Sequence, residues 1–234
     1  MHRFYLERPD ICRGTVTITD PRIVHQAGKV LRMRPGDSLS VFDQKGQEQS
    51  LCVLEIDKRK LLCQIIEPIF RDTEPSIAIS LYQAIPKKVA LFEFVVQKAT
   101  ELGVSHIYPL ITERTEKRRL GKFERLSAIV MEAAEQCNRT RVPVIHHPVS
   151  FETALAQVTH GYMAYEFDKS KSLLNYGSAL KEGRAIQLFI GPEGGWTQKE
   201  VDLAERAGVH RFHLGPRTLR METAAIASLA LLLP

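Results

Sequence analysis

The stretch AIQLFIGPEGGW, residues 185–196, places a short apolar run directly before a loop that contains three glycines. The run 185–190 has the length and composition of a buried strand. Glycine tolerates positive φ angles and lets the backbone approach a ligand closely. Thr197 and Glu200 follow with the T-x-x-E spacing of a capping box, which predicts a helix that extends to Ala207. The stretch therefore predicts a strand, a loop suited to ligand contact and a helix.

The same alternation of strand and helix extends along the chain on both sides of this stretch. The predicted strands are 77–84, 106–111, 142–146, 161–167, 185–190 and 209–214. The predicted helices are 89–102, 120–137, 151–158, 171–180, 197–207 and 222–233. Six strands that are each followed by a helix predict a mostly parallel sheet covered on both faces, an α/β fold.

Residues 1–71 show a different pattern, in which short runs rich in β-branched residues alternate with turns. The predicted strands are 15–19, 38–42, 49–56 and 60–66, and 25–33 is a predicted short helix. This pattern is typical of a small β-barrel. The polar, proline-containing segment 71–76 is the predicted linker, so we expect two domains, 1–71 and 72–234.

Composition limits the class of protein. The chain is 44% apolar and 25% charged, as globular proteins are, and its net charge of +5 permits a polyanionic partner without requiring one. Its longest apolar stretch, 224–233, is about half the length of a membrane span. The N-terminus lacks the apolar core of a signal peptide, and the four cysteines lack metal-ligand spacing. We therefore expect a reduced, cytoplasmic protein with no membrane segment and no metal.

A second unusual loop, LGPRTLRMETA at 214–224, combines a Gly-Pro turn, two arginines and a helix start that carries Glu222. Ligands of open parallel sheets bind beyond the carboxyl ends of the strands, so we expect this loop and 190–196 to form a small-molecule cleft. The first loop is neither a P-loop nor a G-x-G-x-x-G fingerprint, and the first strand of the sheet ends without glycine. A Rossmann dinucleotide site or a classical methyltransferase site is therefore disfavoured.

These stretches together resemble the 16S ribosomal RNA (uracil-N3)-methyltransferase family of the SPOUT class. The resemblance rests on IGPEGGW-T-x-x-E and LGPRTLRMETA, and it extends to QKATELGV at 97–104, EAAEQ at 132–136 and RFY at 3–5. Departures from the family pattern are small: Thr218 stands where isoleucine is usual, and Cys137-Asn138 replaces a small polar pair.

The resemblance implies a PUA-like, RNA-binding β-barrel at 1–71 and a SPOUT α/β domain with a C-terminal trefoil knot at 72–234. It implies a homodimer that uses S-adenosyl-L-methionine to methylate N3 of one uridine in 16S ribosomal RNA of the small ribosomal subunit. A second interpretation is a SPOUT 2′-O-ribose methyltransferase, which the barrel and the second loop disfavour. A non-catalytic RNA-binding assembly protein is a third, disfavoured because the glycine-rich loop is intact.

The implied cofactor is expected to lie between the two loops, with the end of the strand 161–167 as a third wall. Backbone groups of the loops can bind adenine edges and ribose hydroxyls, and apolar side chains can cover the adenine faces. Thr223 either caps the last helix or contacts the ligand. The predicted cofactor-binding residues are Tyr165, Glu166, Ile190, Gly191, Pro192, Glu193, Gly194, Gly195, Leu214, Gly215, Leu219, Arg220, Met221 and Thr223.

Methylation of uracil N3 requires removal of its proton and an offset for the charge that develops on the ring oxygens. Arg220 is the predicted cation. Glu193 and Glu222 are the only carboxylates in the two loops and are the candidate bases. Each has a structural alternative, in which Glu193 accepts loop N–H groups and Glu222 complements the helix N-terminus.

RNA phosphates are expected to contact scattered basic residues rather than one continuous run. For any single one of them, a solvated surface charge is the alternative. The predicted RNA-binding residues are Arg3, Arg22, Lys29, Arg32, Arg34, Lys87, Lys88, Arg114 and Arg139.

Overall fold

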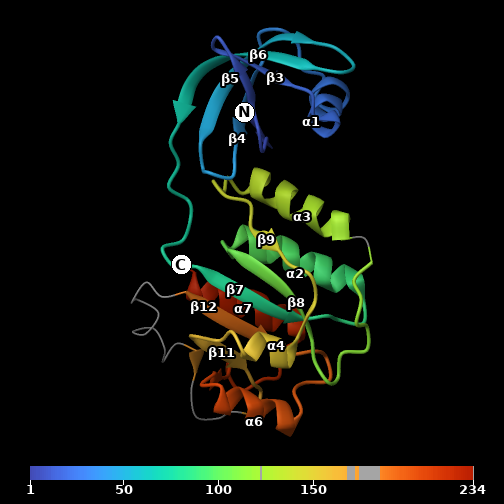
Figure 1. The fold of residues 1–234 in the computed structure, drawn as a ribbon, viewed down its shortest axis with the longest axis vertical. Coiled ribbons are helices and arrows are strands. Elements are labelled where there is room, and N and C mark those ends of the chain that lie inside the picture. Colours follow the sequence, from blue (N-terminus) through green and yellow to red (C-terminus); the bar gives the residue numbers. More distant parts are fainter. Residues whose placement is uncertain (122, 168–171, 174–184, 234) are drawn as a thin grey trace. The chain divides into compact units, whose positions relative to one another are not determined.

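The computed structural model describes residues 1–121, 123–167, 172–173 and 185–233. The chain, coloured along the sequence in Figure 1, forms two compact units. Unit 1 comprises Met1–Glu74 together with Ala134–Arg141, and unit 2 comprises Pro75–Ala133 and Val142–Pro234. Unit 1 therefore includes a segment from the middle of the chain, which the sequence pattern did not reveal.

Unit 1 contains a six-stranded sheet with the order β1-β4-β5-β6-β3-β2. The pair β1–β4 is parallel and the other pairs are antiparallel. The four predicted strands correspond to β3–β6. The strands β1 and β2 were missed because neither HRFY nor DIC is rich in β-branched residues, the signal on which the other strands were predicted. The bounds are β1 (His2–Tyr5), β2 (Asp10–Cys12), β3 (Thr15–Ile18), β4 (Ser38–Phe42), β5 (Glu48–Ile56) and β6 (Leu61–Ile69).

The predicted helix at 25–33 is corrected by the structure, in which the helical segment begins earlier. It consists of α1 (Pro21–His25) followed by a π-helical stretch, Gln26–Val30. The Asp20 side chain accepts a hydrogen bond from the Arg22 backbone N–H, and proline occupies the first helical position. Asp20-Pro21 is thus a helix-start signal that the apolar pattern alone did not indicate.

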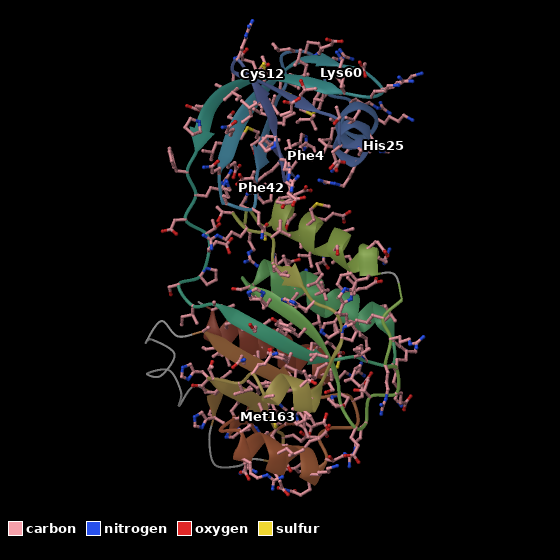
Figure 2. All side chains as sticks on the ribbon, viewed as in Figure 1. Phe4, Cys12, His25, Phe42, Lys60 and Met163 are labelled. Atoms are coloured by element: carbon pink, nitrogen blue, oxygen red, sulfur yellow. The ribbon has the colours of Figure 1, made fainter. Side chains whose placement is uncertain are left out.

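A buried charge network connects Ala134–Arg141 to the sheet of unit 1. Arg3 Nε donates to Glu48 Oε2 at 3.0 Å, and its Nη1 and Nη2 donate to the backbone oxygens of Ala134 and Arg139. The Arg3 guanidinium also lies 3.5 Å from the ring centroid of Phe42, which is labelled with Phe4 in Figure 2. Arg3 is therefore part of the core of this unit.

This network corrects two of the predicted RNA contacts. The side chains of Arg3 and Arg139 are each only 4% exposed. Arg139 Nη2 lies 2.6 Å from Glu74 Oε2 within unit 1. Neither guanidinium can reach an RNA phosphate without breaking a buried ion pair. Arg22 is half-buried and is also engaged, because it donates to Glu135 Oε1 and to the Tyr5 backbone oxygen.

We expect Glu48 to make the stability of unit 1 depend on pH. Burial alone would raise the pKa of Glu48, but hydrogen bonds from Arg71, Ser40 and Arg3 outweigh it and hold the pKa below its ordinary value of 4.5. A carboxyl with a depressed pKa stabilises the fold above its unfolded pKa, and this stability is lost as the pH falls through the folded pKa. Wild-type protein should therefore lose stability progressively below pH 4.5.

The test is urea unfolding at pH 7 and under acidic conditions. Glu48→Gln should lower stability at pH 7 by about 3 kcal/mol, because it leaves the buried guanidinium of Arg3 uncompensated, and should weaken the acid dependence. Glu55→Gln, in an exposed pair with Lys60, is the control and should change little. Equal acid dependence in wild type and Glu48→Gln would contradict the assignment.

In its described residues, unit 2 is built on a seven-stranded sheet with the order β10-β8-β7-β12-β11-β13, and β9 pairs with β8 (Figure 1). All of these strand pairs are parallel, which confirms the predicted mostly parallel sheet. The two-residue strand β10 was not predicted. The bounds are β7 (Ile79–Ala84), β8 (His106–Ile111), β9 (Val144–Ile145), β10 (Val149–Ser150), β11 (Gly161–Ala164), β12 (Ile186–Ile190) and β13 (His210–Phe212).

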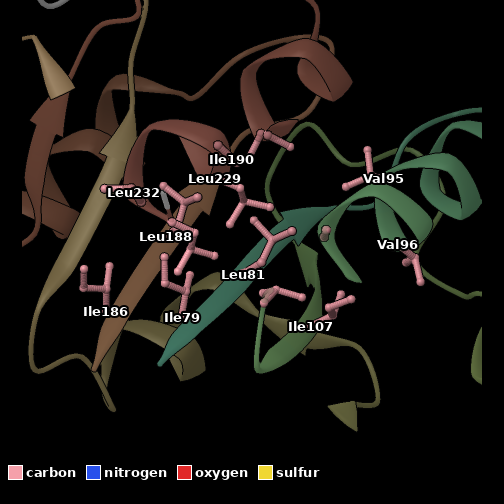
Figure 3. Packing of buried hydrophobic residues seen from close by; sticks show 14 of the residues in the cluster. Ile79, Leu81, Val95, Val96, Ile107, Ile186, Leu188, Ile190, Leu229 and Leu232 are labelled. Atoms are coloured by element: carbon pink, nitrogen blue, oxygen red, sulfur yellow. The ribbon is translucent and has the colours of Figure 1, made fainter. Parts of the chain in front are cut away.

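Helices cover both faces of this sheet, as predicted. Leu81 and Leu188 pack with residues of α2 and α7 such as Leu229, as Figure 3 shows, and Phe189 packs on the other face with Phe151 of α4 and Val201 of α6. None of the described helices has the length and apolar composition needed to cross a membrane. The predicted helix at 171–180 lies outside the described residues except for residues 172–173. The helix bounds are α2 (Val89–Glu101), α3 (Phe123–Gln136), α4 (Phe151–Leu155), α6 (Gln198–Arg206) and α7 (Met221–Leu232).

Candidate functional site

The carboxyl ends of the parallel strands of unit 2 meet at one edge of the sheet, where a pocket of about 460 Å³ lies. A volume of this size is typical of small-molecule sites. Its walls come from the end of β11, the loop after β12 and the segment between β13 and α7, because β11 lies between β12 and β13 in the sheet. The two unusual loops of the sequence therefore meet in one pocket.

Most of the predicted cofactor-binding residues line this pocket. They are Tyr165, Glu166, Ile190, Gly191, Pro192, Glu193, Gly195, Leu214, Gly215, Leu219, Arg220 and Met221. Two predicted residues do not. Gly194 lines a neighbouring pocket, and Thr223 is exposed in the first turn of α7. Thr223 does not cap the helix either, because Arg220 occupies the cap position and no side chain caps it.

Sequence reasoning missed several residues of the wall. Trp196, Arg217 and Thr218 belong to the two unusual loops, 190–196 and 214–224, so their positions in the sequence could have identified them. Leu91 lies on α2 and could be found only from the order of the strands, which places β7 beside β12. The wall residues that were not predicted are Leu91, Ala164, Trp196, Phe212, His213, Arg217, Thr218 and Ala224.

The buried indole of Trp196 holds the loop after β12 in place. Its Nε1–H donates to the Ala164 backbone oxygen at 3.0 Å, which ties the loop to the end of β11. A Cβ atom at Gly191 would lie 2.9 Å from this ring, so the close approach requires glycine. Gly195 has φ +69°, and a Cβ there would lie 3.0 Å from Glu166 Oε1. At two of the three positions, Gly191 and Gly195, steric constraints therefore require glycine.

The predicted capping box is confirmed and connects two loops. The Thr197 hydroxyl accepts the Glu200 backbone N–H, and Glu200 Oε2 accepts the Thr197 backbone N–H at 2.9 Å. Glu200 Oε1 also accepts the backbone N–H of Glu113, in the loop after β8. Arg114 in that loop donates to the Gly194 backbone oxygen at 2.6 Å. The glycine-rich loop is therefore held from both of its sides.

Charged groups of both signs line the pocket. The lining contains three glutamates, Glu166, Glu193 and Glu222, and two arginines, Arg217 and Arg220. Glu193 Oε1 accepts the backbone N–H of Lys87 at 3.1 Å. One oxygen of this carboxylate thus has the structural role considered above, in which Glu193 accepts a loop N–H group. With the residues that the structure describes, the Arg220 side chain forms no ion pair, which leaves its guanidinium available to a ligand.

The lining fits the cofactor that the sequence resemblance implies. Apolar side chains such as Ile190, Leu219 and Met221 can contact an adenine ring. Glycine backbone can lie close to the ligand, and the carboxylates suit ribose hydroxyls and a positively charged sulfonium. The lining is therefore chemically compatible with S-adenosylmethionine.

The remaining basic candidates are exposed. In unit 1 these are Lys29, Arg32 and Arg34. In unit 2, Lys87, Lys88 and Arg114 are exposed, and Lys87 and Arg114 line the neighbouring pocket. These six, unlike Arg3 and Arg139, can reach a partner.

Comparison with family models gives two matches. Residues 73–233 match an RNA methyltransferase domain, and residues 18–66 match an RNA methyltransferase PUA domain. Together these matches cover most of the chain.

Similar proteins share both sequence and fold. The chain is 33% identical over 237 residues to Ribosomal RNA small subunit methyltransferase E of Synechocystis, covering 98% of this chain and 76% of the relative. It is 34% identical to the Bacillus subtilis protein of the same name, covering 88% of this chain and 85% of the relative.

Two solved structures extend the similarity to the fold. A Ribosomal RNA small subunit methyltransferase E from Neisseria gonorrhoeae, bound to S-adenosyl methionine, is 32% identical with a TM-score of 0.88 and covers 98% of this chain and 95% of its own. A protein from Legionella pneumophila, solved in complex with the bound cofactor SAM, is 30% identical with a TM-score of 0.89, and the match covers 98% of this chain and 96% of that chain. The likeness confirms the predicted PUA-like and SPOUT folds.

Proposed function

Because the chain belongs to the ribosomal RNA small subunit methyltransferase E family, we propose that it methylates N3 of one uridine in 16S ribosomal RNA, with S-adenosylmethionine as methyl donor. The observation that carries this proposal is the meeting of the two family loops in one pocket whose lining fits the donor. The proposal includes a cytoplasmic homodimer, an RNA-binding role for 1–71, and cofactor binding and catalysis in 72–234.

S-Adenosylmethionine, when bound, supplies an electrophilic methyl carbon on a positively charged sulfur. The chain's own residues must hold the uracil in place, take the N3 proton and stabilise charge on O2 and O4. Glu193 and Glu222 are the candidate proton acceptors, and both line the pocket. Arg220 stands between the loop and α7 with its guanidinium exposed, so it is the candidate for charge stabilisation.

The decisive experiment incubates the protein with isotopically labelled S-adenosylmethionine and unmethylated small ribosomal subunits, and maps the modified nucleoside by mass spectrometry. We expect label on N3 of a single uridine. Label on a ribose would indicate the 2′-O-methyltransferase reading. No incorporation, from protein that binds the cofactor, would indicate the assembly-protein reading.

Exposed basic residues of unit 1 are expected to contact RNA phosphates. Replacing Lys29, Arg32 and Arg34 together with glutamate should weaken binding to small subunits. It should also reduce the slope of log K against log salt by about 0.7–0.9 for each phosphate that the variant no longer neutralises. Binding is measured over a range of salt concentrations.

The matched control makes the same charge change in the turn between β5 and β6, at Lys58, Arg59 and Lys60. It should have a much smaller effect. Equal losses in both triple variants would show that net charge alone, rather than this surface, is responsible.

A further inference from the structure

A second pocket, of about 480 Å³, lies next to the first and shares Glu193 with it. It is formed by the residues that follow β7, β8 and β12. The lining residues are Lys87, Glu113, Arg114, Thr115, Glu116, Glu193 and Gly194. Since one carboxylate borders both pockets, a group bound in the second lies beside the predicted methyl-donor site.

Three side chains of this pocket make hydrogen bonds or ion pairs and still have free hydrogen-bonding capacity. Arg114 uses Nη1 to donate to the backbone oxygens of Gly194 and Trp196, and its other N–H groups have no acceptor among the described residues. Glu193 uses Oε1 to accept the Lys87 backbone N–H, which leaves Oε2 available. The Lys87 ammonium pairs with Glu116 at 2.7 Å and has three N–H donors in total.

The charge of the lining argues against a phosphate as the ligand. Glu113, Glu116 and Glu193 outnumber Lys87 and Arg114, so the pocket has a net charge of −1 by simple count. A neutral ring that both accepts and donates hydrogen bonds suits this mixture better. The free groups offer, in combination, two cationic donors and one carboxylate acceptor.

The imide edge of uracil is complementary to this set, because it presents an acceptor, a donor and a second acceptor at O2, N3–H and O4. We propose that the second pocket binds the ring of the target uridine, with Glu193 accepting N3–H and with Arg114 and Lys87 each donating to a ring oxygen in the bound state. Arg220, on the wall of the first pocket, keeps its proposed role of stabilising the charge that develops during methyl transfer. This inference rests on the proposed function and turns Arg114 and Lys87 from phosphate contacts into base contacts. Single-stranded bases are commonly read through this edge.

The arrangement explains how uridine is distinguished from cytidine. Cytosine has a lone pair at N3 instead of a proton, and an amino group in place of O4. It would set that lone pair against the Glu193 carboxylate and the amino group against a cation. A site built to hydrogen-bond one edge rejects a ring whose donors and acceptors are exchanged.

The test measures equilibrium binding to small subunits that carry uridine or cytidine at the target position, with S-adenosylhomocysteine present so that no methyl transfer occurs. Wild type should bind the uridine form about 10-fold more tightly, within the range for base discrimination by paired hydrogen bonds. Arg114→Met should reduce this ratio to near 1. Arg206→Met, an exposed arginine of α6 outside this pocket, is the control and should retain the full ratio.

The variant Glu193→Gln distinguishes the proposed contact between Glu193 and the base from a purely structural role of Glu193. A glutamine can still accept the Lys87 N–H, and its amide can donate to cytosine N3, so affinity for the cytidine form should rise. Equal weakening of both forms by Arg114→Met would assign Arg114 to a phosphate and overturn the inference, as would an unchanged ratio in both variants. Label on a nucleoside other than N3-methyluridine in the mapping experiment overturns the proposed function itself, so the two failures are distinguishable.

Discussion

Arg220→Ala should lower the single-turnover methylation rate by about 100-fold or more, the effect of removing a preorganised charge-stabilising donor. The Arg220 side chain lines the pocket and forms no ion pair with the described residues, Glu222 included. Its guanidinium is therefore available to interact with the substrate. Affinity for S-adenosylmethionine should change little, since the charge is needed mainly in the transition state. Rates are measured at saturating RNA and cofactor.

Arg220→Lys should recover only part of this loss, because an ammonium cannot present the planar fork of a guanidinium. Arg206→Ala on α6 is the control and should keep the wild-type rate. If Arg220 instead binds a phosphate, its removal weakens RNA binding and leaves the saturated rate near normal. A wild-type rate in Arg220→Ala would remove this residue from the mechanism.

Gly191→Val should reduce S-adenosylmethionine affinity by about 100-fold or more, the scale on which small misplacements act in a preorganised site. A Cβ at this position would lie 2.9 Å from the Trp196 ring, so the indole must move and its bond to the Ala164 oxygen must break. Calorimetry measures the affinity, and circular dichroism checks that the variant is folded.

Gly121→Val is the matched control, because a Cβ at Gly121 meets no atom within 4 Å. It should bind the cofactor as the wild type does. Normal affinity in a folded Gly191→Val protein would place the cofactor elsewhere.

Much of unit 2 could be predicted from sequence because its signals are local. The apolar run 106–111 coincides with β8, and Thr197 and Glu200 form the predicted capping box. The meeting of the two loops followed from one general rule, that the ends of parallel strands share an edge. No local pattern identifies Leu91 as a wall residue, because its place depends on which strands are neighbours.

Charged residues were the least predictable of the candidate functional residues. Arg3 and Arg139 are as basic in sequence as Lys29, but Glu48 and Glu74, which neutralise them, lie 45 and 65 residues away. Whether an arginine is buried with a carboxylate or exposed to a partner depends on such distant pairings. Periodicity carries no information about them.

The inclusion of Ala134–Arg141 in unit 1 has a consequence for how the chain matures during synthesis. The carbonyl oxygens that Arg3 binds belong to residues translated long after Glu74, with about 60 residues in between. At ordinary elongation rates of about 5–20 residues per second, the N-terminal sheet waits about 3–12 seconds for this segment. During that interval Arg3 lacks the backbone oxygens of Ala134 and Arg139, to which it donates in the folded protein. The nascent chain therefore cannot complete its first unit before much of the second unit has been synthesised.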